Sequence, residues 1–124
     1  MNGTDEIIRE GCSAERSGEG CDCGQEPEED RFQRTRRLIG AEALEMLHAS
    51  KVLVFGVGGV GGYVCEALAR AGVGNIDIVD KDVVDITNIN RQIIATTDTI
   101  GLPKVEVCKE RMLSINPEIQ VGAK

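Results

Sequence analysis

A run of glycine residues between an apolar stretch and a helix-like stretch constrains the fold of this chain more than any other feature. The run covers residues 56–62 and follows residues 52–55, a continuous apolar stretch typical of a strand buried on both faces of a parallel sheet. Residues 60–71 then repeat apolar side chains at helical spacing. The glycines of the G-x-G-x-x-G spacing are Gly56, Gly58 and Gly61. A strand, a glycine turn and a helix in this order predict a phosphate-binding loop.

The segments around this loop show the periodicities of further helices and strands. Residues 36–48 are predicted as a helix, and residues 76–79 and 119–121 as strands. Pro103 suits the first turn of another helix. The apolar stripe predicted for the first helix consists of Leu38, Ile39, Ala41, Leu44, Met46 and Leu47. The buried stripe predicted for the last helix consists of Val105, Cys108, Met112 and Ile115.

This order predicts an α/β fold in which a helix precedes a Rossmann-like, nucleotide-binding β-α-β-α-β half of a doubly wound sheet. Gly72 or Gly74 is expected to end the middle helix. Residues 81–102 form a long polar connection, and such length in a compact domain usually carries function. Because a full sheet needs more strands, we expect the chain to be the N-terminal piece of a larger protein, truncated in its third strand.

The first thirty residues differ in charge from the rest of the chain. Residues 1–30 hold ten of the 21 acidic residues and only two arginines, so the negative net charge belongs to this leader. Its low apolar content predicts a disordered segment. The leader lacks the features of a signal peptide, and no apolar run approaches the ~20 residues that span a bilayer, so we expect a cytoplasmic protein.

Five cysteines divide between the leader and the predicted helices. Cys12, Cys21 and Cys23 lie in the leader without a nearby histidine, so unpaired thiols are expected there, with redox chemistry or metal capture as the alternative. Cys65 and Cys108 fall on apolar helix faces, where cysteine usually acts as a small buried hydrophobic residue.

Two aspartates follow the second predicted strand. Asp80 stands 19 residues after Gly61, where a carboxylate accepts hydrogen bonds from a ribose diol. The alternative is a carboxylate that caps a turn at the end of the strand. Asp82 is a further candidate for nucleotide binding, and the alternative is that it shapes the loop or faces solvent.

Cationic and amide side chains in the long connection and just after it favour ATP over a dinucleotide as the ligand. A dinucleotide pyrophosphate is satisfied by backbone amides, whereas a triphosphate and its leaving group need side-chain cations. Arg91 offers a planar fork for oxygen atoms, and Lys104 offers a mobile point charge. Asn88, Asn90 and Gln92 supply amides for the nucleotide and the loop. We therefore expect ATP, with Arg91 and Lys104 as catalytic residues.

Four arginines cluster around the start of the first predicted helix. They are Arg31, Arg34, Arg36 and Arg37. Because arginine is unfavourable beside the positive end of a helix dipole, we expect the cluster to face an anion or acid elsewhere. It either pairs with the acidic leader or contacts a phosphate, on this subunit or on a neighbour.

The stretch from residue 31 to residue 121 resembles the ThiF/MoeB/E1 superfamily of ATP-dependent adenylating enzymes. The matching text is "RLIG" with "EAL" (37–44), "GVGGVGGYVCEALARAGVGNIDIVDKDVVDITNINRQI" (56–93), "GLPKVEV" (101–107) and "INPEIQV" (115–121). Within the superfamily, "TNINRQI" is more similar to the tRNA threonylcarbamoyladenosine dehydratase branch than to the "SNLQRQ" style of sulfur-carrier activators.

The resemblance implies a role for each motif. Gly59 lies against the nucleotide, Asp80 holds the ribose, and the phosphates are bound by Asn88, Arg91 and Lys104. It also implies a homodimer in which Arg31 or Arg34 reaches the ATP of the partner. The implied substrate is the carboxylate of threonylcarbamoyl-adenosine in tRNA, which ATP activates so that loss of the activated oxygen gives the cyclic form.

The resemblance also implies magnesium, with a metal-binding aspartate after a fourth strand. This chain holds no counterpart of that strand, so no metal ligand is assigned and the piece alone is expected to lack full activity. The division that follows is an acidic disordered leader over 1–30 and the N-terminal part of an ATP-binding ThiF-like domain over 31–124.

Other functions fit part of this pattern. Adenylation of the C-terminus of a ubiquitin-like or sulfur-carrier protein needs nearly the same nucleotide half, with that protein as partner in place of tRNA. A nicotinamide-dependent oxidoreductase would explain the glycine motif alone. A non-catalytic interaction fragment would explain the fold. The chain has three aromatic residues and shows no basic stripe with stacking side chains, so the tRNA expectation rests on resemblance.

Overall fold

A computed structural model describes residues 29–124. The element order is α1 (Gln33–Ile39), α2 (Ala41–Ala49), β1 (Lys51–Phe55), α3 (Gly61–Ala71), β2 (Asn75–Val79), α4 (Lys104–Ile115) and β3 (Gln120–Ala123), with short 3-10 turns at Ile86–Asn88 and Thr97–Thr99. The predicted leader lies almost wholly outside the described residues, and so do Cys12, Cys21 and Cys23. The predicted β-α-β-α-β order is confirmed.

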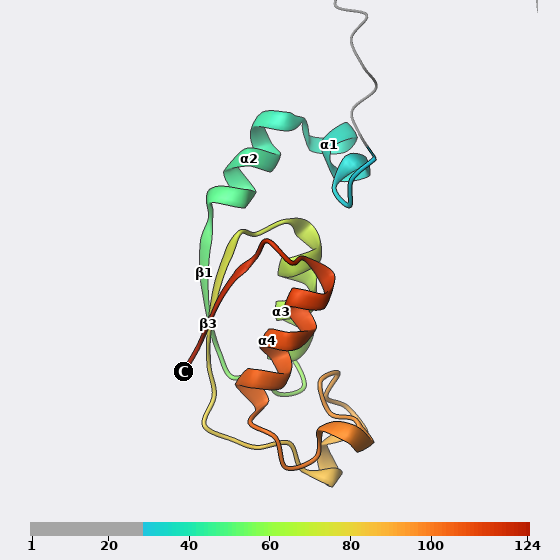
Figure 1. The fold of residues 1–124 in the computed structure, drawn as a ribbon, viewed down its shortest axis with the longest axis vertical. Helices are drawn as coiled ribbons and strands as arrows, with labels where there is room; N and C mark the ends of the chain where they lie inside the picture. Colours follow the sequence, from blue (N-terminus) through green and yellow to red (C-terminus); the bar gives the residue numbers. More distant parts are fainter. Residues whose placement is uncertain (1–28) are drawn as a thin grey trace, which may run out of the picture.

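The three strands form one parallel sheet in the order β1-β2-β3. Figure 1 shows α3 and α4 side by side on one face of this sheet, with α1 and α2 beyond the end of the sheet at which β1 begins. The core lies between the sheet and these two helices, and its fully buried members include Ile76, Ile78, Cys65 and Met112. The helix stripe predicted over α4 is confirmed at Val105, Cys108 and Met112, all of which are buried.

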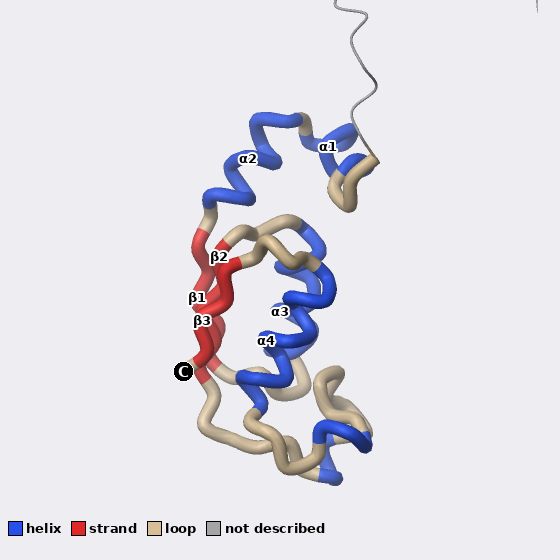
Figure 2. Tube along the Cα trace, viewed as in Figure 1, coloured by secondary structure: helices blue, strands red, loops and turns tan. Residues whose placement is uncertain are grey.

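The expectation that β1 is buried on both faces is wrong. Leu53 is 52% exposed and Phe55 is 75% exposed, whereas Val54 between them is buried. The reason is topological. The sheet grows in one direction from β1 to β3, and two right-handed crossovers in that direction place both helices on the same face (Figure 2). In residues 29–124 the opposite face of the sheet therefore has no helix over it.

The predicted single helix over 36–48 is also wrong, because α1 and α2 are separate. Gly40 divides them with a φ of 88°, in the left-handed region that favours glycine. The turn splits the predicted apolar stripe. Leu38 is 85% exposed and Met46 is 68% exposed, and Leu44 is the buried member of α2.

The end of α3 follows the prediction. Gly72 is its C-cap, has a φ of 100°, and donates its backbone N–H to Leu68 O. This left-handed cap turns the chain into β2. β2 runs parallel to β1 and ends beside its C-terminal end. The glycine loop, Asp80 and the long connection therefore all lie at one end of the molecule (Figure 1). No helix in residues 29–124 is long and apolar enough to cross a membrane.

Candidate nucleotide-binding site

The glycine loop is held tightly between β1 and α3. Gly56 has a φ of 83° and donates its N–H to Val79 O on β2 at 2.8 Å. A Cβ at Gly61 would lie 1.7 Å from Gly56 O, so no side chain fits there. Gly61 is therefore required by close packing of the loop on its own helix, which is a structural role. A Cβ at Gly58 or Gly59 would meet only ordinary contacts, at 3.7 and 3.9 Å.

Asp80 connects this loop to the long connection. Its Oδ2 accepts the N–H of Val57 at 2.8 Å, and its Oδ1 accepts the N–H of Asp82 at 2.8 Å. The carboxylate is thus fixed at the C-terminal end of β2, directly beside the turn where a phosphate-binding loop presents its ligand. Each oxygen keeps a second lone pair, so the position is compatible with a ribose diol.

Asn88 shapes the start of the polar run. Its Oδ1 accepts the N–H of Asp85 at 3.0 Å, while Asp85 Oδ1 accepts the N–H and the hydroxyl of Thr87 at 2.8 and 2.7 Å. The hydrogen bonds from the hydroxyl and the N–H of Thr87 lower the pKa of Asp85. These reciprocal bonds form a capping box around Ile86–Asn88. The side-chain oxygen of Asn88 is therefore used by the loop itself.

The end of the polar run lies against the glycine loop. Arg91 Cγ is 3.9 Å from the Cβ position of Gly59, and Gln92 Nε2 is 3.7 Å from that of Gly58. The guanidinium of Arg91 is exposed and donates to Thr87 O at 3.0 Å and to Asn90 Oδ1 at 2.8 Å. The fold therefore brings together two segments that are about thirty residues apart in the sequence.

Gln92 contains a buried oxygen atom that lacks a partner. The residue is 7% exposed, and its Oε1 has no hydrogen-bond donor among residues 29–124. A buried amide oxygen without a donor costs roughly 1–3 kcal/mol. The same side chain lies against the glycine loop through Nε2, 3.7 Å from the Cβ position of Gly58, so its oxygen is a candidate acceptor for a ligand or a bound water.

Lys104 is the most deeply buried charged residue that was predicted for the site. Its side chain is 8% exposed, and its Nζ lies 3.8 Å from Oδ2 of the exposed Asp82. It is also the first residue of α4, where helix dipole and side chain are both positive. Two exposed carboxylates, Asp82 at 3.8 Å and Asp85 without a direct ion pair, compensate this buried charge poorly, so the site favours a further anion. Through Asp82 and Asp80, Lys104 is connected to the glycine loop.

The predicted N-terminal arginines lie at the other end of the molecule. Arg31 donates to Ile115 O at 3.2 Å and to Asn116 Oδ1 at 3.3 Å, so it binds the C-terminal end of α4. Arg36 pairs with Asp30 at 2.6 Å, which confirms pairing with the acidic leader for this one arginine. Arg34 is exposed and makes no hydrogen bond or ion pair within residues 29–124. Figure 1 shows α1, which carries Arg34, at the opposite end of the molecule from the glycine loop, and Arg31 is bonded to the C-terminal end of α4.

Comparison with known proteins places this geometry in a family. Residues 32–124 match the ThiF family. The chain belongs to the ThiF family. A tRNA threonylcarbamoyladenosine dehydratase of Bacillus subtilis is 56% identical over 92 residues, which cover 74% of this chain and 36% of that protein. A sulfur carrier protein adenylyltransferase of Thermus thermophilus is 39% identical over 96 residues, 76% of this chain and 35% of that protein.

The fold of this ThiF-family chain also matches solved structures. The crystal structure of the E. coli tRNA N6-threonylcarbamoyladenosine dehydratase TcdA in complex with ATP superposes with a TM-score of 0.74 at 48% identity, over 76% of this chain and 39% of that chain. The predicted resemblance and fold are thereby confirmed. The chain spans about a third of the length of the curated dehydratases that it matches, with 34–36% of each covered.

Some features of the ThiF-family site were not visible in the sequence. The N–H of Val57 anchors Asp80, although a valine inside a glycine motif carries no signal for that role. Gly62 packs against Ile93, whose Cγ2 would lie 3.1 Å from a Cβ at this glycine. The glycine at position 62, which lies outside the G-x-G-x-x-G spacing, was the available signal, since packing as well as phosphate approach selects glycine.

Proposed function

We propose that residues 31–124 form the N-terminal, ATP-binding part of an adenylating enzyme that activates a carboxylate. The observation that carries this proposal is the burial of Lys104, whose only ion pair within residues 29–124 is the 3.8 Å contact with the exposed Asp82, at the same end of the sheet as the glycine loop. The backbone of the loop would hold phosphate oxygens, and Lys104 with Arg91 would neutralise the triphosphate and the leaving pyrophosphate. Asp80 would hold the ribose.

The proposed substrate is the carboxylate of threonylcarbamoyl-adenosine in tRNA. The dehydratase relatives support it, because they are 46–56% identical to this chain, against 39% for the sulfur-carrier enzyme. ATP would activate the carboxylate, and attack within the modified nucleoside would expel the activated oxygen and close the ring. A tRNA substrate also agrees with the proposed cytoplasmic location.

We further propose a homodimer in which Arg34 reaches the ATP of the partner subunit. Arg34 is supported over Arg31 because its guanidinium is uncommitted among the described residues, whereas Arg31 is bonded to the end of α4. Magnesium is proposed to arrive on the phosphate oxygens of ATP, as it commonly does at such sites. Residues 29–124 contain no group of three potential ligands that could hold a metal by themselves.

Equilibrium titration with ATP tests the nucleotide site. Lys104→Met keeps the apolar stem of the side chain and removes the charge, so affinity for ATP should fall about 100-fold, as expected for loss of a buried charge-assisted contact. Lys109→Met is the matched control, because Lys109 lies on the same helix and forms no ion pair within residues 29–124. Equal affinity for both variants would contradict the assignment of Lys104.

The substrate is tested with the enzyme of which this chain is proposed to be part. With ATP, magnesium and modified tRNA, the nucleoside should lose the mass of one water. The second candidate function, adenylation of a carrier protein, is favoured by the Thermus thermophilus relative. ATP–pyrophosphate exchange that depends on a small protein ending in Gly-Gly, and not on tRNA, would replace the first assignment by the second.

A further inference from the structure

The polar run presents Arg91 from a turn that burial holds only in part. Ile86 and Ile89 of this turn are 66% and 41% exposed, and Asn88 is the buried residue between them. Arg91 lies just after the turn and is itself exposed. Long exposed side chains keep much of their rotamer freedom unless hydrogen bonds restrict them. The position of the guanidinium therefore depends on the hydrogen bonds within residues 85–91.

Asp85 holds the start of this turn through one carboxylate oxygen. Its Oδ1 accepts the backbone N–H of Thr87 at 2.8 Å and the hydroxyl of Thr87 at 2.7 Å. Because the acceptor is ionised, both hydrogen bonds are charge-assisted and stronger than neutral ones. The first bond fixes the backbone of Thr87, and the second fixes the rotamer of its side chain. The nucleotide site proposed above gives no role to Asp85.

The carbonyl of Thr87 in turn holds the guanidinium of Arg91. Nη1 of Arg91 donates to Thr87 O at 3.0 Å and to Asn90 Oδ1 at 2.8 Å. Nε and Nη2 form no hydrogen bond within residues 29–124. These two nitrogens make up an edge of the guanidinium that can bind two oxygens of one phosphate side by side. Thr87 therefore links Asp85 to a guanidinium that still has a phosphate-binding edge.

The hydrogen bonds of Asp85 matter more for this arrangement than its charge. Asp85 is exposed, and solvent screens the charge of an exposed carboxylate. The hydrogen bonds of Thr87 are the main cause of the lowered pKa of Asp85, and the charge of Lys104 contributes less. On charge alone, a carboxylate beside a triphosphate site would repel the ligand. The ordering of Arg91 gives this carboxylate a physical reason to stand beside such a site.

We propose that Asp85 is a positioning residue that orders the guanidinium of Arg91 for the phosphates of the nucleotide. The proposal rests on the proposed function, because that function supplies the triphosphate. Asp85 acts through Thr87 and touches neither the nucleotide nor the reacting atoms. A side chain that is ordered before binding loses less conformational entropy when the ligand arrives. Without the hydrogen bonds of Asp85, affinity for ATP should therefore fall about fivefold.

Titration of the full chain with ATP tests the proposal. Asp85→Ala removes the acceptor and should weaken ATP binding about fivefold. Asp85→Asn keeps an oxygen for the N–H of Thr87, because asparagine caps about as well as aspartate, and should stay within about twofold of the wild type. Asp98→Ala is the matched control and should bind like the wild type, because Asp98 is an exposed acid of the other 3-10 turn. Equal weakening by Asp85→Ala and Asp85→Asn would assign the effect to charge and overturn the positioning role.

A double-mutant cycle decides whether Asp85 acts through Arg91. In the Arg91→Ala background, Asp85→Ala should have no further effect on affinity for ATP. AMP lacks the pyrophosphate that Arg91 is proposed to neutralise, so Asp85→Ala should leave affinity for AMP unchanged. The same fivefold loss in the Arg91→Ala background, or an equal loss for AMP, would mean that the substitution disturbs the whole loop. Either result would overturn the proposal.

The order of Arg91 can also be measured without nucleotide. Nitrogen relaxation measured by NMR at the Arg91 Nε–H group, identified by its absence in Arg91→Ala, reports this order. The side chain should be ordered in the wild type and Asp85→Asn and mobile in Asp85→Ala. Equal order in all three proteins would overturn the proposal, whatever their affinities for ATP. Absence of ATP binding by the wild type would contradict the proposed function, while the relaxation data would still decide whether Asp85 orders Arg91.

Discussion

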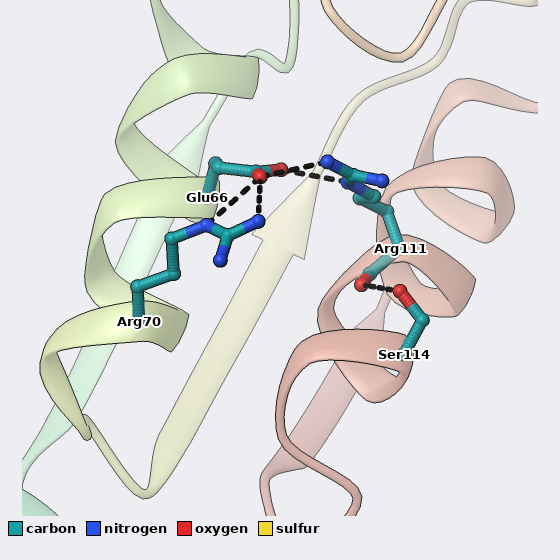
Figure 3. Close-up of polar contacts among 4 residues, drawn as sticks. All are labelled: Glu66, Arg70, Arg111 and Ser114. Atoms are coloured by element: carbon teal, nitrogen blue, oxygen red, sulfur yellow. Dashed lines mark hydrogen bonds and ion pairs between the residues drawn. The ribbon is translucent and has the colours of Figure 1, made fainter. Parts of the chain in front are cut away.

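Glu66 on α3 accepts two hydrogen bonds from the guanidinium of Arg111 on α4, 45 residues further along the chain (Figure 3). Arg111 Nε lies 2.8 Å from Oε2, and Nη2 lies 2.8 Å from Oε1. Arg70, one turn along α3, donates to the same Oε1 at 2.8 and 3.0 Å. The paired geometry is the strong form of this contact. It joins the two helices that cover the sheet and begin at the candidate site.

This contact predicts a loss of stability in acid. Hydrogen bonds from Arg111 and then Arg70 lower the pKa of Glu66 to about 2. Since the unfolded value is about 4.3, the carboxylate contributes its full stability above about pH 5, and this is lost as pH falls toward 2. Both arginines are about half exposed, so we expect protonation of Glu66 to lower the free energy of unfolding by about 1–2 kcal/mol. Urea unfolding measured between pH 6 and pH 2.5 gives the slope of the free energy of unfolding against pH.

The Glu66→Gln variant tests the source of that slope. It should be less stable than the wild type at pH 6 and should approach the wild type as the pH falls. Glu110→Gln is the control, because Glu110 is exposed on α4 and forms no ion pair within residues 29–124. An identical acid dependence in wild type and Glu66→Gln would show that another carboxylate is responsible.

The packing of Gly61 predicts opposite results for alanine at two glycines of one motif. Alanine usually favours a helix over glycine, but a Cβ at Gly61 would lie 1.7 Å from the Gly56 carbonyl oxygen. Gly61→Ala should therefore lower the free energy of unfolding by about 3 kcal/mol. A Cβ at Gly58 would meet only Gln92 Nε2 at 3.7 Å, so Gly58→Ala should remain close to wild type. Thermal unfolding of both variants decides the matter, and equal melting temperatures would count against the packing role.

The sequence predicted the sheet, its two covering helices and the glycine turn, because their signals are local. The apolar run before Gly56 favours a strand through the β-propensity of its residues, and the helical spacing around Met112 predicts a helix with one apolar face. The position of Gly72 was predictable for the same reason, since a helix end depends on its own backbone conformation.

The exposure of individual side chains and the contacts of the site depend on which elements pack against each other. No local sequence pattern contains that information. Leu38 and Phe55 belong to apolar patterns but are exposed in residues 29–124, because no described element packs over them. The ion pair of Lys104 with Asp82 joins chain segments about twenty residues apart, and the packing of α3 on α4 joins segments about forty residues apart. Lys104 was a candidate because of its residue type, and its burial in the fold gives the physical reason to expect an anion beside it.

The separate surroundings of Arg31 and Arg34 predict different defects in their variants. Arg31→Ala should lower the melting temperature, because it removes a cation bonded to the C-terminal end of α4. Arg34→Ala should leave the melting temperature unchanged and weaken ATP binding about tenfold, if its guanidinium reaches a phosphate of the partner. Thermal unfolding and ATP titration of both proteins separate the two effects.

Mixing two defective proteins tests whether Arg34 acts across the dimer. In a mixed dimer of Arg34→Ala and Lys104→Met subunits, one site regains both wild-type side chains, so random mixing should restore tight binding to about a quarter of all sites. Mixing Arg34→Ala with itself is the control. If the mixture binds ATP tightly at no more sites than that control, Arg34 does not act in the partner's site.

The unpaired oxygen of Gln92 predicts a substitution that stabilises the protein and weakens its binding. Gln92→Met has a similar volume and removes the buried Oε1 that lacks a donor, so the ligand-free protein should gain about 1 kcal/mol of stability. If Oε1 accepts a hydrogen bond from the nucleotide or its water, the same variant should bind ATP about tenfold more weakly. Thermal unfolding without ligand and titration with ATP measure the two effects on one sample. Glu45→Met is a control, because Glu45 is exposed on α2 at the far end of the molecule. Higher stability with unchanged affinity would mean that the oxygen is strained by the fold and serves no ligand.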